Sequence, residues 1–593
     1  MRPSLIALAI ALAAAGYAQA ANHAMPVASV GAGPFKVACS NIAQDESFIA
    51  ALASTPEEIW EGRPRNGEGR YISQILAAPD TALRFDVPVP DLREIYPRFA
   101  GDLVPHVAIV CHPTPQANGD PDYLLPGTGD TVPRMQPAGA APRLIGIAEH
   151  AAAYGIFPSP APPSVPARLP LLLFSHGLGG SPISPGHLEA LVDLASHGYV
   201  VGAVFHGDPR FSRIRIGDLG DFLTLLAHFE EFVEMELMRP ASLKALVDRL
   251  LADPGYAPGI DPDRIGAFGA SMGGQAVANL LGARLTTGLG LACRDTVTDP
   301  RVKAAVGLVP YAGQSFLPSF CDDQQGAERI ERPYLAISGT ADFTAPIKMV
   351  EQAVNRFRGS RYLVELKDVE HGYEPAMRDD VMTWTVTFLN AYLGVGADPG
   401  AIARFIRMGN VSGGTLDALR LDVHVPSAPA DPDEALTREF YHEPLGHYFI
   451  ANGADEIALI ESGRAGPDWQ LTGHAFRSWT RLPAQNFTTA VPVCRFYGAL
   501  AGGPNSHFFT ASADECDLVK RAGGWYYEGT GFHIVPVSAD GSCPSGYLQV
   551  LRAYNEGFAR NDSNHRFTTS DSTWREMQRH GWTLEGAVMC ALP

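Results

Sequence analysis

The sequence predicts an α/β protein with a mostly parallel, doubly wound sheet, followed by a β-rich module of three repeats. Two observations lead to this prediction. Short apolar runs alternate with helix-like patterns through the middle of the chain, and beyond residue 437 one sequence unit recurs about every 60 residues. The chain has 593 residues, of which 46% are hydrophobic, so it can fill more than one core. This composition excludes a disordered protein.

The N-terminus has the pattern of a secretory signal peptide. Arg2 precedes an apolar run over residues 5–15, and the small residues Ala18 and Ala20 follow. We expect cleavage after Ala20. The apolar run is too short to span a bilayer, and no later stretch reaches about 18 uninterrupted apolar residues. The sequence therefore predicts a secreted or periplasmic protein without a transmembrane segment, which we expect to be a monomer.

Cysteine spacing and net charge argue against some kinds of site and partner. None of the eight cysteines has the C-x-x-C spacing of a zinc or redox site, so we interpret them as disulfides of an exported protein. They fall into local groups: Cys39 with Cys111, Cys293 with Cys321, and Cys494, Cys516, Cys543 and Cys590, for which three connectivities stay open. The formal net charge of −19 repels phosphate backbones and anionic lipids, which argues against nucleic acid as a partner.

Apolar runs predict the strands of the sheet. Residues 169–177 (LPLLLFSHG) are apolar along most of their length, which is typical of a strand buried on both faces. A helix is expected next, with Ser184 as its cap, Pro185 in its first turn and Gly198 at its end. Further strands are expected at residues 199–205, 264–268, 303–309, 333–338 and 361–366, and an antiparallel edge strand at 104–110. Ligands of such sheets bind at the carboxyl ends of the strands.

A lone serine marks the turn after one of these strands. In the stretch RIGAFGASMGG, Ser271 lies between Gly269 and Gly273, and a helical pattern follows. A sharp strand-to-helix turn crowds the backbone, and glycines on both sides relieve the crowding. The serine hydroxyl is then exposed at a strand end, while the amide of Met272 opens the helix beside it. This Gly-x-Ser-x-Gly pattern is typical of a nucleophile, although it also occurs by chance.

Two further strand ends supply the partners that a nucleophilic serine needs. Asp342 follows the strand at 333–338, and His371 follows the strand at 361–366. The chain order Ser, Asp, His is that of an α/β-hydrolase, in which histidine takes the serine proton and the acid holds the imidazole tautomer. Asp368 and Glu370 are closer to His371 along the chain, but a neighbour on the same loop rarely aims its carboxylate at the ring. We therefore favour Asp342 as the acid.

Other residues near the strand ends are candidates for the oxyanion hole and the substrate pocket. The glycine-rich loop SHGLGGS, residues 175–181, offers the Leu178 amide as a partner to that of Met272. His206, Tyr311 and Phe343 follow strand ends and are predicted walls of the site. A series of large apolar residues at near-helical spacing could be core or an acyl-binding lid, and we favour core: Phe211, Phe222, Leu226, Phe229 and Phe232. Phosphate-binding loops, dinucleotide fingerprints and metal-ligand clusters do not occur in the sequence, so we predict no cofactor and no metal.

These motifs together resemble a known family. LLLFSHGLGGS, GYVVGAVFHGDPRFS, RIGAFGASMGG, ISGTADFTAP and VEHGYEP look like the platelet-activating-factor acetylhydrolase and dienelactone-hydrolase-like group of α/β-hydrolases, and more distantly like bacterial cutinases. The resemblance covers about residues 104–393. It implies Ser271 as nucleophile, Asp342 as acid, His371 as base, and Leu178 and Met272 as oxyanion donors. Dienelactone hydrolases use cysteine where this chain has Ser271, and that difference favours ordinary ester hydrolysis.

The C-terminal part repeats itself around three histidines. His447, His507 and His565 each open a similar unit, and each unit ends in a tryptophan-containing turn. Three units of this length are expected to complete one core between them, in a pseudo-threefold and trefoil-like module. The module resembles an uncharacterised repeat module of secreted bacterial hydrolases. Its histidines and aromatics could stack on sugars and bind carbohydrate or cell wall, or could form the repeat core, which we favour.

These observations divide the chain and leave two classes of function. We expect a signal peptide at 1–20, an N-terminal extension at 21–103, the hydrolase at 104–410, a linker at 411–436 and the repeat module at 437–593. The favoured function is a secreted serine carboxylic ester hydrolase that acts through an acyl-enzyme. The alternative is a surface- or carbohydrate-binding protein with a degenerate hydrolase scaffold. The sequence does not identify the ester, which could be small or polymeric.

Overall fold

The computed structural model describes two compact units of the chain. The described residues are 25–592 except 41–44, 61, 63–64, 67–70, 77–82, 121, 125–130, 133–139, 154–164, 185, 213–223, 373–374, 395–399, 413–417, 427–430, 483–489, 499–502 and 545–546. The predicted signal peptide lies outside them. The first unit, called the sheet unit here, comprises Ser29–Ala397 and Gly414–Ser427. The second, the repeat unit, comprises Asp398–Gly413 and Ala428–Pro593, together with strand β1 (Met25–Ala28).

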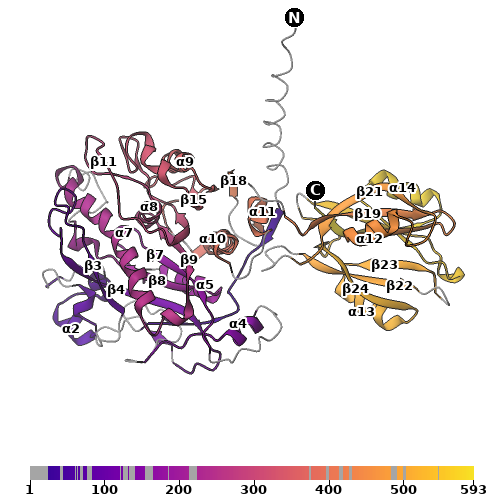
Figure 1. The fold of residues 1–593 in the computed structure, drawn as a ribbon, viewed down its shortest axis with the longest axis horizontal. Helices are drawn as coiled ribbons and strands as arrows, with labels where there is room; N and C mark the ends of the chain where they lie inside the picture. The colour runs from indigo at the N-terminus through magenta and orange to yellow at the C-terminus, as the bar shows by residue number, and fades with distance from the viewer. Residues whose placement is uncertain are drawn as a thin grey trace, which may run out of the picture. The chain divides into compact units, whose positions relative to one another are not determined.

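The sheet unit is built on a ten-stranded mixed sheet (Figure 1). Its strand order is β18-β16-β15-β12-β9-β7-β8-β4-β2, with β3 also paired to β4. The parallel strands are β7 (Leu169–Ser175), β8 (Val200–Phe205), β9 (Ile260–Ala270), β12 (Val302–Leu308), β15 (Tyr334–Gly339) and β16 (Arg361–Leu366). The antiparallel strands at the edges are β2 (Lys36–Cys39), β3 (Leu83–Pro88), β4 (Leu103–Thr114) and β18 (Ala418–His424). The predicted strands of the sheet all occur, and residues 104–110 lie in the antiparallel strand β4.

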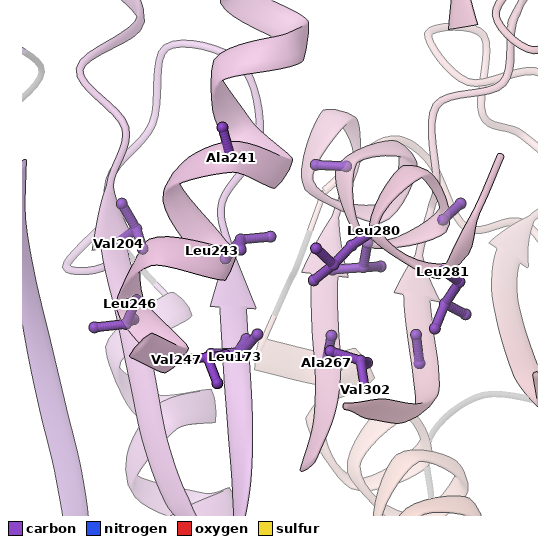
Figure 2. Packing of buried hydrophobic residues seen from close by; sticks show 14 of the residues in the cluster. Leu173, Val204, Ala241, Leu243, Leu246, Val247, Ala267, Leu280, Leu281 and Val302 are labelled. Atoms are coloured by element: carbon purple, nitrogen blue, oxygen red, sulfur yellow. The ribbon is translucent and has the colours of Figure 1, made fainter. Parts of the chain in front are cut away.

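Helices cover both faces of this sheet. The first face carries α7 (Phe229–Ala252), α8 (Met272–Leu281) and α9 (Ile347–Arg356), whose apolar side chains share one core with the strands. The other pair, α5 (His187–Ser196) and α10 (Arg378–Leu393), contact each other and the sheet. Figure 2 shows Val247 of α7 beside the strand side chain Leu173, Leu246 of α7 below Val204, and Leu280 of α8 above Ala267. Leu246 is fully buried, so truncating it to alanine would cost about 2–5 kcal/mol.

Smaller elements complete the sheet unit. They are α2 (Glu46–Ala51), α3 (Pro56–Trp60), β5 (Tyr123–Leu124), β6 (Thr131–Val132), α4 (Ile147–Ala153), β10 (Leu285–Thr286), β11 (Cys293–Arg294), β13 (Gly313–Gln314), β14 (Leu317–Pro318) and the short 3-10 helices η2 (Ile72–Gln74), η3 (Asp208–Arg210), η4 (Ala257–Gly259), η5 (Asp322–Arg329) and η6 (Pro375–Met377). Two of them, η3 and the β13–β14 hairpin, lie in connections that follow β8 and β12, so they belong to the end of the sheet where the site lies.

Two local predictions differ from the structure. Residues 411–436 were predicted to be a linker, whereas Ala418–His424 form β18 and pair with β16. Apolar Leu419, Leu421 and Val423 alternate with polar residues there, but the adjoining proline- and alanine-rich stretch masks this short pattern. Helix α5 begins at His187 with Gly186 as its cap, because the Ser184 hydroxyl accepts a hydrogen bond from the Ser181 amide instead.

In the repeat unit the same order of elements occurs three times. The order is strand, strand, helix, strand: β19 (Glu434–His442), β20 (His447–Ala451), α12 (Ala454–Glu461) and β21 (Trp469–Trp479); β22 (Val491–Gly498), β23 (Ser506–Thr510), α13 (Ala513–Ala522) and β24 (Trp525–Pro536); β25 (Leu548–Tyr554), β26 (His565–Thr568), α14 (Asp571–Arg579) and β27 (Thr583–Ala591). The first strand of each set pairs antiparallel with the other two. Each set also contains a helix, so the module is not built of strands alone. Outside these sets lie α11 (Ala401–Ile406) and β17 (Met408–Ser412), which pairs with β1, and the third set also contains the short 3-10 helix η7 (Phe558–Arg560) between β25 and β26.

Ion pairs join the three sets in a closed cycle. Arg495 of the second set contacts Glu456 of the first at 2.7 Å, and Arg552 of the third contacts Glu515 of the second at 2.9 Å. The cycle closes with the charges reversed, since Glu439 of the first set accepts from Arg566 of the third at 2.8 Å. Both side chains of this last pair are buried. Each set therefore contacts the other two, and the buried pair lies at the junction of the first and the last.

The eight cysteines form four disulfides. Cys39 pairs with Cys111 and Cys293 with Cys321, as predicted. The connectivity that the sequence left open is Cys494 with Cys516 and Cys543 with Cys590. Disulfides of this number fit an extracellular or secreted protein. In the part of the chain described, no helix combines the length and the apolar character needed to cross a membrane.

Candidate active site

Ser271 lies at the sharp turn from β9 into α8. Its backbone has φ 54° and ψ −119°, which is a strained conformation for a residue with a side chain. Its amide donates to the Leu308 carbonyl of the neighbouring strand at 2.8 Å. The flanking glycines are sterically required: a Cβ on Gly269 would collide with the Gly273 backbone, and one on Gly273 would collide with the Ser175 carbonyl. The sequence thus forces the hydroxyl to the carboxyl end of the sheet.

Asp342 and His371 reach Ser271 from the next strand ends. The His371 Nδ1 lies 2.8 Å from Asp342 Oδ2, and its Nε2 lies 2.9 Å from Ser271 Oγ. The Asp342 side chain is fully buried, and its Oδ1 accepts from the amides of Thr344 at 2.9 Å and Ala345 at 2.7 Å. Because a carboxylate only accepts hydrogen bonds, Nδ1 must carry the proton and Nε2 is free to accept from the serine hydroxyl.

The alternative acids are placed differently. The Asp368 side chain is 83% exposed and lies 4.0 Å from Lys367 Nζ, and Glu370 is also exposed. The backbone explains this orientation, because Asp368 has φ 57° and its amide donates to the Thr340 hydroxyl at 2.9 Å. Its carboxylate is therefore directed to solvent while Asp342 holds the imidazole.

The loop between β7 and α5 passes directly beside Ser271. A Cβ on Gly177 would lie 3.4 Å from the Ser271 Cβ and 3.9 Å from its Oγ, which is ordinary van der Waals distance, so the loop backbone lies next to the serine side chain. Leu178 follows in this loop, and Met272 is the first residue of α8. Among the described residues neither amide donates to a protein acceptor. Both are thus available to a substrate oxygen, as the first amides of a helix are in general.

His206 does not line an open site. It is 2% exposed, and its ring nitrogens lie 2.8 Å from Ser175 Oγ and 3.1 Å from Ser242 Oγ. Burial, followed by the nearby charge of Arg239, lowers the pKa of His206 well below its usual value, so the ring is neutral. We predicted that His206 lines the substrate pocket, but hydrogen bonds to the hydroxyls of Ser175 and Ser242 hold its ring in the interior.

The other two predicted wall residues lie next to the site. The Tyr311 amide donates to the Ser271 carbonyl at 3.0 Å, and burial raises the pKa of its half-buried phenol. Phe343, next to Asp342, is 89% exposed. Three members of the apolar series are buried in the core as favoured: Phe211, Phe229 and Phe232. Leu226 is 36% exposed, and Phe222 lies outside the described residues.

Sequence reasoning missed several buried charged residues behind the site. Arg239 of α7 and Asp208 of η3 form an ion pair whose side chains are 1% and 5% exposed. Glu236, one turn before Arg239, accepts a hydrogen bond from the Gln275 side-chain amide at 2.8 Å. Burial raises the pKa of Glu236 to about 8. Asp208 could have been noticed because it follows a strand end. An arginine or a glutamate within a helix carries no sequence signal of burial.

Comparisons with known proteins agree with this geometry in one segment. A family model described as platelet-activating factor acetylhydrolase, isoform II, matches residues 159–213, which contain β7, the loop beside Ser271 and β8. This match supports a hydrolase similar to platelet-activating-factor acetylhydrolase, and an ester as the bond it cleaves. A domain of unknown function (DUF5648) matches residues 435–592. No curated protein matches the chain. Within the described ranges, side chains of His, Cys, Asp and Glu form no group of three or more that could hold a metal ion.

Proposed function

We propose that the chain is a secreted serine carboxylic ester hydrolase with an α/β-hydrolase fold. The observation that carries the proposal is the hydrogen-bonded series Asp342, His371 and Ser271 at three strand ends of one sheet. Three side chains with no other reason to meet form the arrangement needed to activate a serine nucleophile. The family match over residues 159–213 supports the same kind of reaction.

In the proposed mechanism, Ser271 Oγ attacks the ester carbonyl while His371 Nε2 takes its proton. The carbonyl oxygen becomes an oxyanion, which the amides of Leu178 and Met272 stabilise. Collapse of this intermediate expels the alcohol, which receives the proton from His371, and leaves an acyl group on Ser271. Water then repeats the steps with His371 as base and releases the carboxylic acid. Buried Asp342 stabilises the imidazolium in both halves, and the reaction needs no cofactor.

The exposed position of Phe343 and the partly buried Tyr311 suggest an apolar entrance to the site, which we propose as part of the acyl- or alcohol-binding surface.

We propose that the repeat unit anchors the enzyme to carbohydrate or cell-wall material. The repeat histidines themselves are packed inside: His447 is 3% exposed, and His565 stacks on Tyr554 with ring centroids 4.8 Å apart. We therefore assign them to the repeat core. Exposed aromatic side chains such as Tyr526 (65%) and Phe558 (85%) are better placed to contact a polymer.

The test of the hydrolase is the turnover of p-nitrophenyl esters of graded acyl length. Ser271→Ala and His371→Ala should lower kcat/KM by several orders of magnitude with unchanged circular dichroism. His580→Ala, which removes an imidazole that is 66% exposed in the repeat unit, serves as the control and should keep wild-type rates. Retention of most activity by Ser271→Ala would mean that Ser271 is not the nucleophile, whereas a wild-type chain without turnover on any of these esters would favour the binding-protein alternative.

A further inference from the structure

The loop that carries Leu178 is held from behind by a buried ion pair. Arg239 Nη1 donates to the His176 carbonyl at 2.5 Å, and its Nη2 donates to the Gly177 carbonyl at 3.1 Å. The Asp208 carboxylate accepts from Arg239 and also from the Gly179 amide at 3.0 Å. The backbone on both sides of Leu178 is therefore bonded to this pair.

One of these bonds acts on the peptide group that contains the Leu178 amide. The Gly177 carbonyl and the Leu178 N–H belong to the same planar trans peptide, so they point in opposite directions. Arg239 draws the carbonyl toward the interior and thereby directs the N–H away from the core. The His176 ring donates to the same carbonyl at 2.7 Å, and the Gly180 amide does so at 3.3 Å within the turn. Together with Arg239 these donors fix the peptide plane.

The neighbouring histidines support this arrangement as neutral hydrogen-bonding groups. His176 Nε2 accepts from the His206 amide at 3.2 Å, which leaves Nδ1 to donate to the Gly177 carbonyl. Burial, followed by the charge of Arg239, lowers the pKa of His176 to about 3. The guanidinium is consequently the positive group behind the loop, and it polarises the Gly177–Leu178 peptide in the sense that favours an anion on the N–H side.

Stability alone is a weak reason for burying such a pair. The desolvation of two charges often equals or exceeds their attraction, so well-packed apolar residues could serve as well. Instead, the hydrogen bonds of the pair go to three backbone groups of one glycine-rich loop, the carbonyls of His176 and Gly177 and the amide of Gly179.

We propose that Arg239 and Asp208 are positioning residues that hold the Leu178 amide in the geometry of the oxyanion hole. This inference rests on the proposed function. The pair does not touch the substrate; it sets the direction of a donor that interacts most strongly when the carbonyl oxygen becomes negative. Its loss should therefore affect the transition state more than substrate binding.

The test compares Arg239→Met with Arg332→Met in the full-length chain. Arg332 is a matched control, because its guanidinium donates to three backbone carbonyls of the same unit that lie outside the 175–181 loop, those of Asp299, of Val302 at the start of β12 and of Leu281 at the end of α8. The readouts are kcat and KM for p-nitrophenyl butyrate and the Ki of an alkyl trifluoromethyl ketone. Ser271 Oγ adds to the carbonyl carbon of the ketone while its proton passes to His371, and the carbonyl oxygen becomes an oxyanion that the oxyanion hole binds.

We expect Arg239→Met to lower kcat about 100-fold, as a donor displaced by about 1 Å does, with little change in KM. The Ki of the ketone should rise by a similar factor. Arg332→Met should leave kcat and Ki unchanged, even where it lowers stability. If Arg239→Met does not fold, Arg239→Lys gives the same test, since one ammonium cannot match the planar fork of a guanidinium; it should lower kcat and raise Ki together.

Two results would overturn the inference: wild-type kcat and Ki in a folded Arg239 variant, or a fall in kcat without a rise in Ki. Ser271→Ala is measured alongside to separate this inference from the proposed function. If Ser271→Ala keeps its activity, the proposed function fails. If Ser271→Ala is inactive while the Arg239 variant matches wild type, only the positioning role fails.

Discussion

Replacing Asp342 by asparagine should abolish most ester turnover through the tautomer of His371. Asp342 Oδ1 accepts two backbone amides, so an asparagine would keep its carbonyl oxygen there and turn its NH₂ toward the imidazole. That NH₂ is a donor, and it would make Nδ1 the acceptor. The proton would then lie on Nε2, which could no longer take the proton of Ser271.

The size of this effect follows from the role of the acid. Loss of the correct tautomer in a Ser-His-Asp system lowers kcat about 10⁴-fold, which corresponds to about 5.5 kcal/mol of transition-state stabilisation. Folding should change little, because the side-chain shape and the two amide bonds are kept. Asp368→Asn is the matched control, since its carboxylate is 83% exposed, and it should stay within about twofold of wild type.

The assay is kcat/KM on a short-chain p-nitrophenyl ester at pH 7, with circular dichroism as the check on folding. A folded Asp342→Asn with near-wild-type turnover would refute the tautomer argument. If Asp368→Asn were the inactive variant instead, the acid would have to be moved to Asp368.

Three other predictions concern stability and the division of the chain. Burial raises the pKa of Glu236 from 4.5 to about 8, so between pH 4.5 and 8 the folded chain holds a proton that the unfolded chain has released. In this range the free energy of unfolding therefore falls with rising pH, by up to about 1.4 kcal/mol per pH unit. Glu236→Gln should flatten urea-unfolding stability between pH 5 and 8; an unchanged slope would mean that Glu236 does not titrate there. Glu439→Gln leaves Arg566 buried without its partner and should lower the free energy of unfolding by about 3–5 kcal/mol. Its control, Arg438→Gln on the same strand, breaks an exposed pair and should lower it by less than about 1 kcal/mol. Equal losses of the two variants in urea unfolding would contradict the role of the buried pair in closing the cycle. A chain truncated after His424 keeps β18 and should hydrolyse soluble esters like the full chain, but it should no longer bind insoluble cell-wall polymer. If the truncated chain folds and yet loses soluble-ester turnover, the repeat unit is not a separate anchor.

The strands of the sheet were predictable because they are buried on both faces. β8 is apolar throughout and β7 is apolar up to Ser175, and β16 has the bounds that the sequence predicted. The glycines around Ser271 were equally informative, since their absence of a side chain is a steric requirement of the turn. These signals are local, so a single sequence contains them.

The rest depends on contacts between distant segments. The inward position of the His206 ring depends on hydroxyls of Ser175 and Ser242, more than 30 residues away in each direction, and the burial of Arg239 depends on a loop more than 60 residues earlier in the chain. Edge strand β18 is short and pairs with only one neighbour, so its alternation competes with the adjacent Pro- and Ala-rich stretch. Helices within the repeats were hidden because their apolar faces cover only a few residues each.

The most direct test of the account is to locate the acyl group itself. The chain is mixed with p-nitrophenyl butyrate, quenched with acid within milliseconds, digested and examined by mass spectrometry, with Ser271→Ala treated in parallel. The account predicts a butyryl group on the peptide that contains Ser271, formed in a burst of p-nitrophenol and absent from the variant. A butyryl group on another residue that forms and decays at the rate of turnover, or full turnover by Ser271→Ala, would contradict it.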